Sequence, residues 1–242
     1  MSAASPPEDG FRHEYADVNG LGYHYVREGS GPPLVLVHGW PGFYYEWRLN
    51  IRPLAEHFDV IVPDMRGYAY TDKPDVLPEV GYTPAVFADD IAAFLDALGI
   101  EKASFVTHDF GAAWVQSFAR NYKDRVDKLV MFNPPYPGIG MRWLEVSHVR
   151  EVWYQMFHQL DWAEDLVGSS REATRLYVQH FLSHWSHDKS IWTPEEMLRL
   201  RGAVDLIVER ANNGHQSRVL FLVPPMNKCS GPLYEMVMML DT

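Results

Sequence analysis

The sequence contains a single cysteine, Cys229, so no disulfide can form within the chain. Positive charge is also scarce, because 21 lysines and arginines stand against 32 aspartates and glutamates, for a formal net charge of −11. Without a basic cluster the chain lacks the feature that attracts a phosphate backbone, so we expect no nucleic-acid partner. The sequence has no run of about 18 apolar residues, the length needed to span a bilayer. Its N-terminus consists of small and acidic residues and is unlike a signal peptide. These absences predict a cytoplasmic protein with no membrane partner.

Short apolar runs separated by helical patterns indicate an α/β fold. Between two of the runs, Thr83 and Pro84 are typical of the cap and first residue of a helix, which should end near Gly99. Asp64 and Arg66 are expected to be scaffold residues that pair with each other across a turn. The alternation predicts a mainly parallel sheet with helices on both faces. Its strands are expected at residues 22–26, 34–37, 60–62, 103–106, 126–132 and 219–223.

The most informative segment joins one apolar run to a helical pattern. It places the carboxylate of Asp109 at the junction, followed by the small residues Gly111 and Ala112. A strand that turns sharply into a helix presents the residue at the turn on an exposed elbow, where a hydrolase carries its nucleophile, and small neighbours let the turn close. Aspartate is also a good helix N-cap, so this segment alone leaves a purely structural role for Asp109 open.

Two further motifs precede this segment. Residues 38–48 read HGWPGFYYEWR and residues 63–74 read PDMRGYAYTDKP. Together with HDFGAAW at residues 108–114, they resemble the α/β-hydrolase superfamily, and within it the branch of epoxide hydrolases and dehalogenases that attacks with aspartate. The resemblance extends from about residue 11 to about residue 200. Thr107 and Ala69 stand where glycine is usual.

The resemblance implies an α/β-hydrolase fold divided into three parts. Residues 1–137 would form the N-terminal part of the core, and residues 138–200 an inserted helical cap that roofs Asp109 and excludes water. Residues 201–242 would be a divergent segment that returns only in part to the core. We expect the last core strand and helix to be missing, as in a truncated chain. A sheet edge left unpaired in this way would favour a homodimer.

The same resemblance assigns roles to individual residues. The carboxylate of Asp109 would attack an electrophilic carbon and form a covalent ester. Tyr154 matches the cap tyrosine that donates its hydroxyl hydrogen to an epoxide oxygen. The backbone amides of Trp40 and Phe110 would form the oxyanion hole. No metal or cofactor is implied. Supporting positions around the predicted site are His38, Gly39, Pro41, His108 and Trp153.

The residues that should hydrolyse the ester are harder to find. Family members carry an acid after one of the later core strands and a histidine after the last. Here the run at 219–223 is followed by no nearby carboxylate, and no histidine follows His215. Asn133 occupies the other position at which the acid can stand. The second cap tyrosine of the family is not visible either. We therefore expect an ester that hydrolyses slowly.

Three functions remain open at this point. Dehalogenases usually carry a tryptophan or arginine after the nucleophile, and Phe110 offers neither donor. An epoxide needs nothing from that side chain, because its leaving oxygen stays attached to the substrate. The sequence therefore favours an epoxide hydrolase-like enzyme acting on a small apolar electrophile. The alternatives are a haloalkane or haloacid dehalogenase and a non-catalytic binding protein of the same fold.

Overall fold

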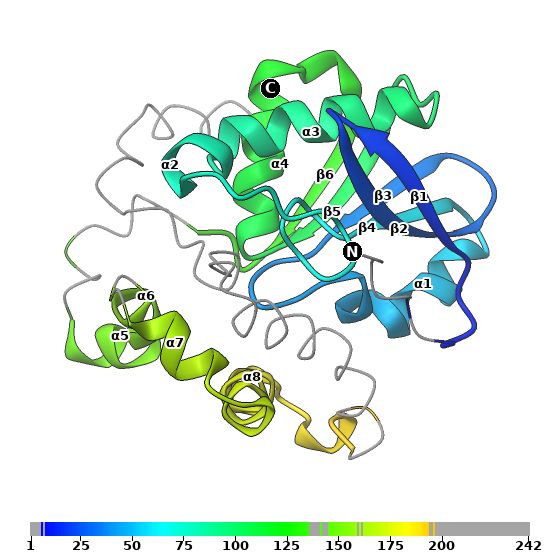
Figure 1. Ribbon diagram of the computed structural model, residues 1–242. Helices are drawn as coiled ribbons and strands as arrows, with labels where there is room; N and C mark the ends of the chain where they lie inside the picture. The colour runs from blue at the N-terminus through cyan, green and yellow to red at the C-terminus, as the bar shows by residue number, and fades with distance from the viewer. Residues whose placement is uncertain are drawn as a thin grey trace.

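A six-stranded sheet organises the chain, as the computed structural model in Figure 1 shows. The structure describes residues 6, 8–135, 141, 145–158, 160, 162–193 and 196. The strand order is β1-β2-β4-β3-β5-β6, in which β4, β3, β5 and β6 run parallel and β1 and β2 are antiparallel at one edge. The strands are β1 (His13–Val18), β2 (Leu21–Gly29), β3 (Pro33–Val37), β4 (Asp59–Pro63), β5 (Ala103–His108) and β6 (Val126–Phe132).

Helices pack on both faces of this sheet, which confirms the predicted α/β fold. Alternate residues of β3 face opposite sides, so Val35 and Val37 join one buried cluster while Leu34 and Leu36 join the other. The first cluster packs against α3 (Pro84–Ala97) and α4 (Phe110–Asn121). The second packs against η1 (Tyr44–Trp47) and α1 (Arg48–Ala55). Two short elements, α2 (Pro78–Gly81) and η2 (Lys123–Arg125), complete this part.

The predicted start of α3 is confirmed. The side chain of Thr83 accepts a hydrogen bond from the backbone N–H of Val86, and Pro84 is the first helical residue, where its missing N–H breaks no hydrogen bond. The helix ends at Ala97, followed by Gly99 with a φ of +68°. Glycine suits this left-handed conformation because it has no Cβ to clash with the backbone.

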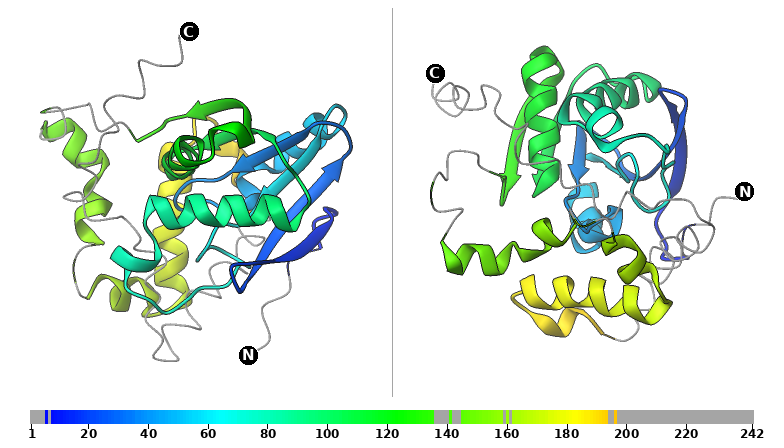
Figure 2. Two further views of the ribbon diagram at one scale, coloured as in Figure 1. Left: turned by 90° about the horizontal axis from the view of Figure 1, so that it is seen from above. Right: turned by 60° about the vertical axis from the view of Figure 1, so that its left-hand side comes forward.

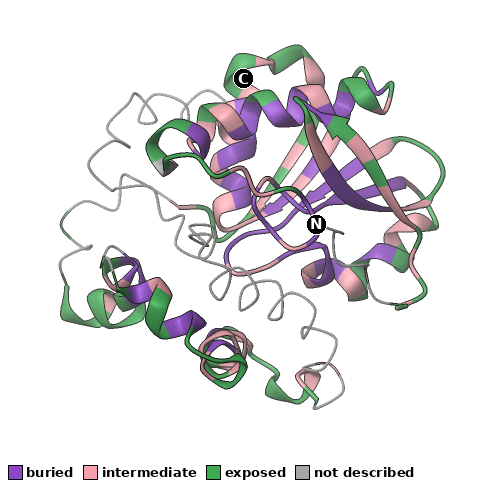
Figure 3. Ribbon diagram, viewed as in Figure 1, coloured by how far each residue is buried: buried purple, intermediate pink, exposed green. Residues whose placement is uncertain are grey.

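A group of helices lies apart from the sheet, and the views in Figures 1 and 2 place it beyond one end of the strands. More of its residues are exposed than in the sheet, as Figure 3 shows. No helix among the described residues is both long and apolar enough to cross a membrane. The elements of this group are α5 (Val146–Glu151), α6 (Trp153–Phe157), α7 (Ala163–Gly168), α8 (Arg171–Trp185) and η4 (Lys189–Ile191).

The expected pairing of Asp64 with Arg66 is wrong. Asp64 accepts a hydrogen bond from His24 Nδ1 at 2.8 Å, and both side chains are fully buried. Arg66 instead forms two hydrogen bonds with the buried carboxylate of Asp90 on α3, at 2.6 and 2.7 Å. The turn after β4 therefore points the two side chains in different directions, and each ties this loop to a separate part of the core.

Several sequence predictions lie outside the described residues. The strand expected at 219–223 and the whole segment 201–242 are among them, as are His215 and both proposed domain boundaries, near 137 and 200. Within the described chain, β6 forms the end of the sheet, and Phe132 on it is 52% exposed.

The Arg66–Asp90 pair provides a test of the fold. Asp90 is fully buried and also accepts hydrogen bonds from Tyr23 and Asn19, so Asp90→Asn should leave the Arg66 guanidinium without its counter-ion. Removal of one partner of a buried pair typically lowers the free energy of unfolding by about 3–5 kcal/mol, and urea denaturation would measure the loss. Asp127→Asn, which affects only an exposed carboxylate, is the control and should change nothing measurable. Equal stability of the two variants would contradict the prediction.

Candidate functional site

Asp109 occupies a strained turn between β5 and α4. Its φ of +50° and ψ of −122° are rare for a residue with a side chain, and its N–H donates to Phe132 O at 3.0 Å. Its side chain does not cap α4. These observations fit the predicted elbow rather than an ordinary N-cap.

Glycine at two positions lets neighbouring backbone segments approach this turn closely. A Cβ on Gly39 would lie 2.8 Å from His108 O and 2.9 Å from Asp109 Oδ1. A Cβ on Gly111 would lie 2.5 Å from His38 O on the neighbouring strand end. Real Cβ atoms do not approach other atoms so closely, so glycine is needed at both positions. The loop after β3 and the first turn of α4 therefore meet directly at Asp109.

Backbone amides hold the Asp109 carboxylate. The N–H of Trp40 donates to Asp109 Oδ1 at 3.0 Å, and the Phe110 amide donates to the same carboxylate. Burial raises the pKa of Asp109, while these two hydrogen bonds and the His108 side chain oppose the rise. The peptide bond between Trp40 and Pro41, in the loop that presents the Trp40 amide, is cis. The two amides predicted to form an oxyanion hole thus bind the carboxylate in the free protein.

Tyr154 on α6 lies over this loop. Its ring stacks on Trp40 with centroids 4.6 Å apart and an interplanar angle of 3°, and it is only 5% exposed. Gln155 Nε2 donates to its hydroxyl at 3.4 Å. Burial, together with the Asp109 charge, raises the pKa of Tyr154 to about 12, so the phenol keeps its proton near neutral pH. The structure therefore brings Tyr154, Trp40 and Asp109 together, although they are far apart in the sequence.

Aromatic side chains of the separate helices surround Tyr154. His158 contacts Trp40 edge-on, and burial lowers the pKa of this histidine to about 3, so it is neutral. Its Nε2 lies 2.5 Å from the hydroxyl oxygen of Tyr177 on α8. Trp153, predicted as a supporting residue, stacks on Phe181 but is 39% exposed, so it packs these helices against one another.

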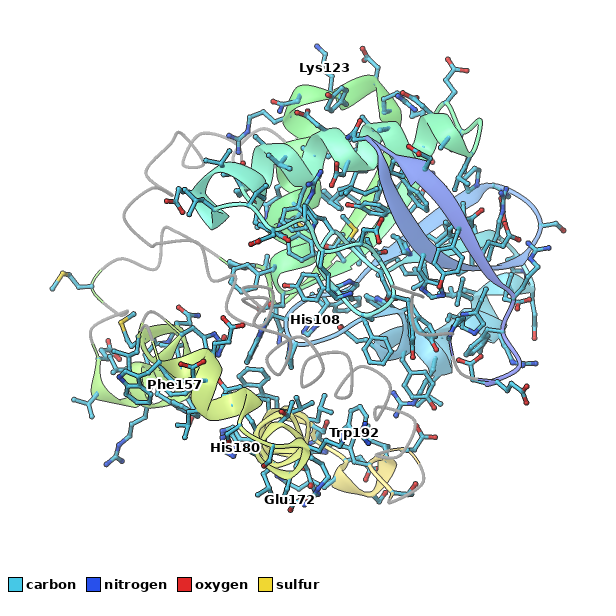
Figure 4. The ribbon with its side chains drawn as sticks, in the orientation of Figure 1. His108, Lys123, Phe157, Glu172, His180 and Trp192 are labelled. Carbon is cyan, nitrogen blue, oxygen red and sulfur yellow. The ribbon has the colours of Figure 1, made fainter. Side chains whose placement is uncertain are left out.

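The two histidines beside the motifs have different environments. His38 is fully buried, its Nδ1 lies 2.9 Å from Gly39 O, and its Nε2 accepts a hydrogen bond from Met65 N–H. Burial lowers the pKa of His38, which is consistent with a neutral ring that links two loops. His108 Nδ1 lies 2.5 Å from Glu46 Oε1. In Figure 4 the side chain of His108 lies on the side of the core nearest the helices that carry Phe157 and His180.

Sequence reasoning missed Glu46. One of its carboxylate oxygens contacts His108 and the other accepts a hydrogen bond from Gly39 N–H at 3.3 Å. Gly42 leaves the space that this carboxylate occupies, because a Cβ on Gly42 would overlap it. An acidic residue within an otherwise aromatic motif was the available signal. Its negative charge acts on both Asp109 and His108.

The fold and this arrangement define the class of protein. The sequence pattern of the alpha/beta hydrolase fold matches residues 32–176, and the chain belongs to this family. Among its relatives, a soluble epoxide hydrolase of Corynebacterium sp. (strain C12) is 33% identical over 197 residues, covering 76% of this chain and 64% of the relative. Epoxide hydrolase 4 of Homo sapiens is 32% identical over 170 residues, covering 69% of this chain and 46% of the relative.

A solved structure of an epoxide hydrolase without ligand supports the same fold. It matches with a TM-score of 0.72 and 28% sequence identity, over 88% of this chain and 74% of that one. The present chain spans less than two thirds of the length of the two sequence relatives above. These comparisons do not favour the dehalogenase or the binding-protein alternative.

The raised pKa of Asp109 makes its ionised form less favourable in the folded chain than in the unfolded one. The free energy of unfolding should therefore fall as the pH rises through this pKa. Asp109→Asn keeps an acceptor for the two amides but has no charge to bury, so it should melt at a higher temperature than the wild type at pH 7. The difference should vanish below about pH 4, where aspartate is protonated in both states. If the melting temperatures of the two proteins did not converge at low pH, the raised pKa of Asp109 would be contradicted.

His108 gives a second pH-dependent test. Burial lowers its pKa, but close contact with the Glu46 carboxylate and the charges of Glu46 and Asp109 raise it by more, so the pKa of His108 is raised overall. Glu46→Gln removes this charge, and the pKa of His108 should fall. NMR titration of the imidazole signals of the wild type and of Glu46→Gln would measure the change. An unchanged His108 titration would show that Glu46 does not control it.

Proposed function

We propose that this protein opens epoxides by attack of the Asp109 carboxylate, through a covalent alkyl-enzyme ester. The observation that carries the proposal is the position of Asp109: a strained elbow holds it, two backbone amides bind its carboxylate, and the phenol of Tyr154 lies above the same loop. This combination supplies a nucleophile, an oxyanion hole and a proton donor within one buried site.

The two carboxylate oxygens would have separate tasks. Oδ1 accepts the Trp40 N–H, which leaves Oδ2 as the attacking atom. As Oδ2 bonds to a ring carbon, the ring C–O bond breaks and its electron pair stays on the epoxide oxygen. Tyr154 then gives its proton to that oxygen. The carbonyl oxygen of the resulting ester remains at the Trp40 amide, where negative charge develops when water attacks the ester.

Phe110 supports an epoxide rather than a halide as substrate. Its side chain is an unsubstituted ring that packs parallel to Trp114 on α4, with centroids 6.5 Å apart. It has no N–H or O–H to solvate a departing halide ion in a buried site. The oxygen of an opening epoxide is served by Tyr154 instead. The similarity to named epoxide hydrolases agrees with this choice.

The hydrolytic half-reaction has no assigned base. Of the two histidines beside the motifs, His38 forms hydrogen bonds with Gly39 and Met65, and His108 contacts the carboxylate of Glu46. The acid–histidine pair of the family would follow the later strands, in residues outside those the structure describes. General base help typically accelerates such a step about 10²- to 10⁴-fold. Because both described histidines beside the motifs already have partners, we propose that the ester of this chain forms faster than it hydrolyses.

Intact-protein mass spectrometry after incubation with styrene oxide tests the proposal. The wild type should gain one substrate mass, and Asp109→Ala should gain none because it has no nucleophile. Tyr154→Phe should gain it about 10²- to 10⁴-fold more slowly, since it lacks the proton donor. Chromatography of the same samples would quantify the diol.

Each outcome has a distinct meaning. An adduct that persists supports both the nucleophile and the slow hydrolytic step. Steady diol formation without an adduct would support the activity but contradict the slow step. Equal modification of the wild type and Asp109→Ala, or neither adduct nor diol from the wild type, would overturn the proposed function.

A further inference from the structure

Tyr68 carries a buried hydroxyl that the proposed reaction has not used. Its side chain is 6% exposed, and its hydroxyl has no hydrogen-bond partner among the residues that the structure describes. A phenol that loses its water on folding without gaining a partner destabilises the fold. Unpaired buried polar groups are rare for this reason, and a catalytic role is one of the explanations for those that occur.

The turn that carries Tyr68 fixes its position. The backbone N–H of Tyr68 donates to Met65 O at 2.9 Å, and its C=O accepts from Thr71 N–H at 3.0 Å. Its neighbours Gly67 and Ala69 both have positive φ, of 87° and 33°. This conformation is strained for alanine, and strained backbone of this kind clusters at functional sites.

Side-chain contacts place the ring of Tyr68 beside the predicted active site. Its ring lies edge-on to His38, 4.8 Å away, and 5.7 Å from Trp114 on α4. His38 contacts the loop that holds Trp40, and α4 begins immediately after Asp109. After burial, the charges of Asp109 and then of Tyr82 and Tyr154 raise the pKa of Tyr68. The phenol therefore keeps its proton and lies within electrostatic range of both Asp109 and Tyr154.

We propose that Tyr68 is a second phenolic donor in the active site, and that its O–H binds the oxygen of the opening epoxide together with Tyr154. The inference rests on the proposed function of Asp109. It assigns to a core loop the role of the family's second cap tyrosine, whose motif is not visible in this sequence.

The two phenols would act differently on the same oxygen. As Asp109 forms its bond to carbon and the ring C–O bond breaks, the oxygen gains negative charge and takes the proton of Tyr154. Tyr68 donates a hydrogen bond and keeps its own proton, so the atoms and charges of the step balance without it. A donor that meets developing charge in a buried site stabilises the transition state more than the bound substrate. Tyr68 should therefore affect the rate of alkylation more than substrate binding.

Tyr68→Phe is the direct test, because it removes one oxygen atom and keeps the ring contacts. Single-turnover consumption of styrene oxide by the full chain, followed with the adduct mass, should slow about 10²-fold, whereas the concentration dependence should change little. Tyr82→Phe is the matched control: it also removes a buried phenol, whose hydroxyl donates to Pro74 O, and the alkylation rate should not change. An alkylation rate of Tyr68→Phe within twofold of the wild type would overturn the proposal.

Thermal unfolding provides an independent readout. Tyr68→Phe removes a hydroxyl without a partner, so its melting temperature should equal or exceed that of the wild type, whereas Tyr82→Phe should melt lower. A lower melting temperature for Tyr68→Phe would contradict the proposal, because it would show that the fold already uses this hydroxyl. Failure of the wild type itself to be alkylated would refute the proposed function of Asp109, a result distinct from an unaffected Tyr68→Phe.

Discussion

The burial of one carboxylate determines how this site is built. Asp109 sits on a strained turn away from water, and ionisation there is unfavourable unless donors replace the lost solvent. The amides of Trp40 and Phe110 provide that replacement. To reach the carboxylate, the loop after β3 must pass so close to it that only glycine fits at position 39. The elbow, the glycines and the amides are therefore consequences of a single constraint.

Buried polar contacts hold the loops around this carboxylate in place. His38 joins the Gly39–Trp40 loop to the turn that carries Tyr68, through Gly39 O and Met65 N–H. Arg66 ties the same turn to α3 through Asp90. These loops have no regular secondary structure of their own, so such contacts replace the ladder of backbone hydrogen bonds. The stacking of Tyr154 on Trp40 then attaches the separate helices to a fixed surface.

Features with a local cause could be predicted from the sequence, and those set by distant contacts could not. The elbow at Asp109 and the capped start of α3 follow from a few adjacent residues, and the structure contains both. Strand β1 was missed because its sequence, HEYADV, is half-exposed and contains no apolar run. The partners of Asp64 and Arg66 lie 40 and 24 residues away, so short-range reasoning paired them wrongly. The unpaired hydroxyl of Tyr68 likewise becomes visible only once its surroundings are known.

The covalent role of Asp109 is the central claim, and oxygen labelling in a single turnover tests it most directly. With enzyme in excess over styrene oxide in H₂¹⁸O, water attacks the ester carbonyl, so the label should enter the Asp109 carboxylate while the first diol formed stays unlabelled. Mass spectrometry of the peptide that contains Asp109, and of the diol, reads both positions whether hydrolysis is fast or slow. A labelled diol beside an unlabelled peptide would mean that water attacks the epoxide itself, and would contradict the account.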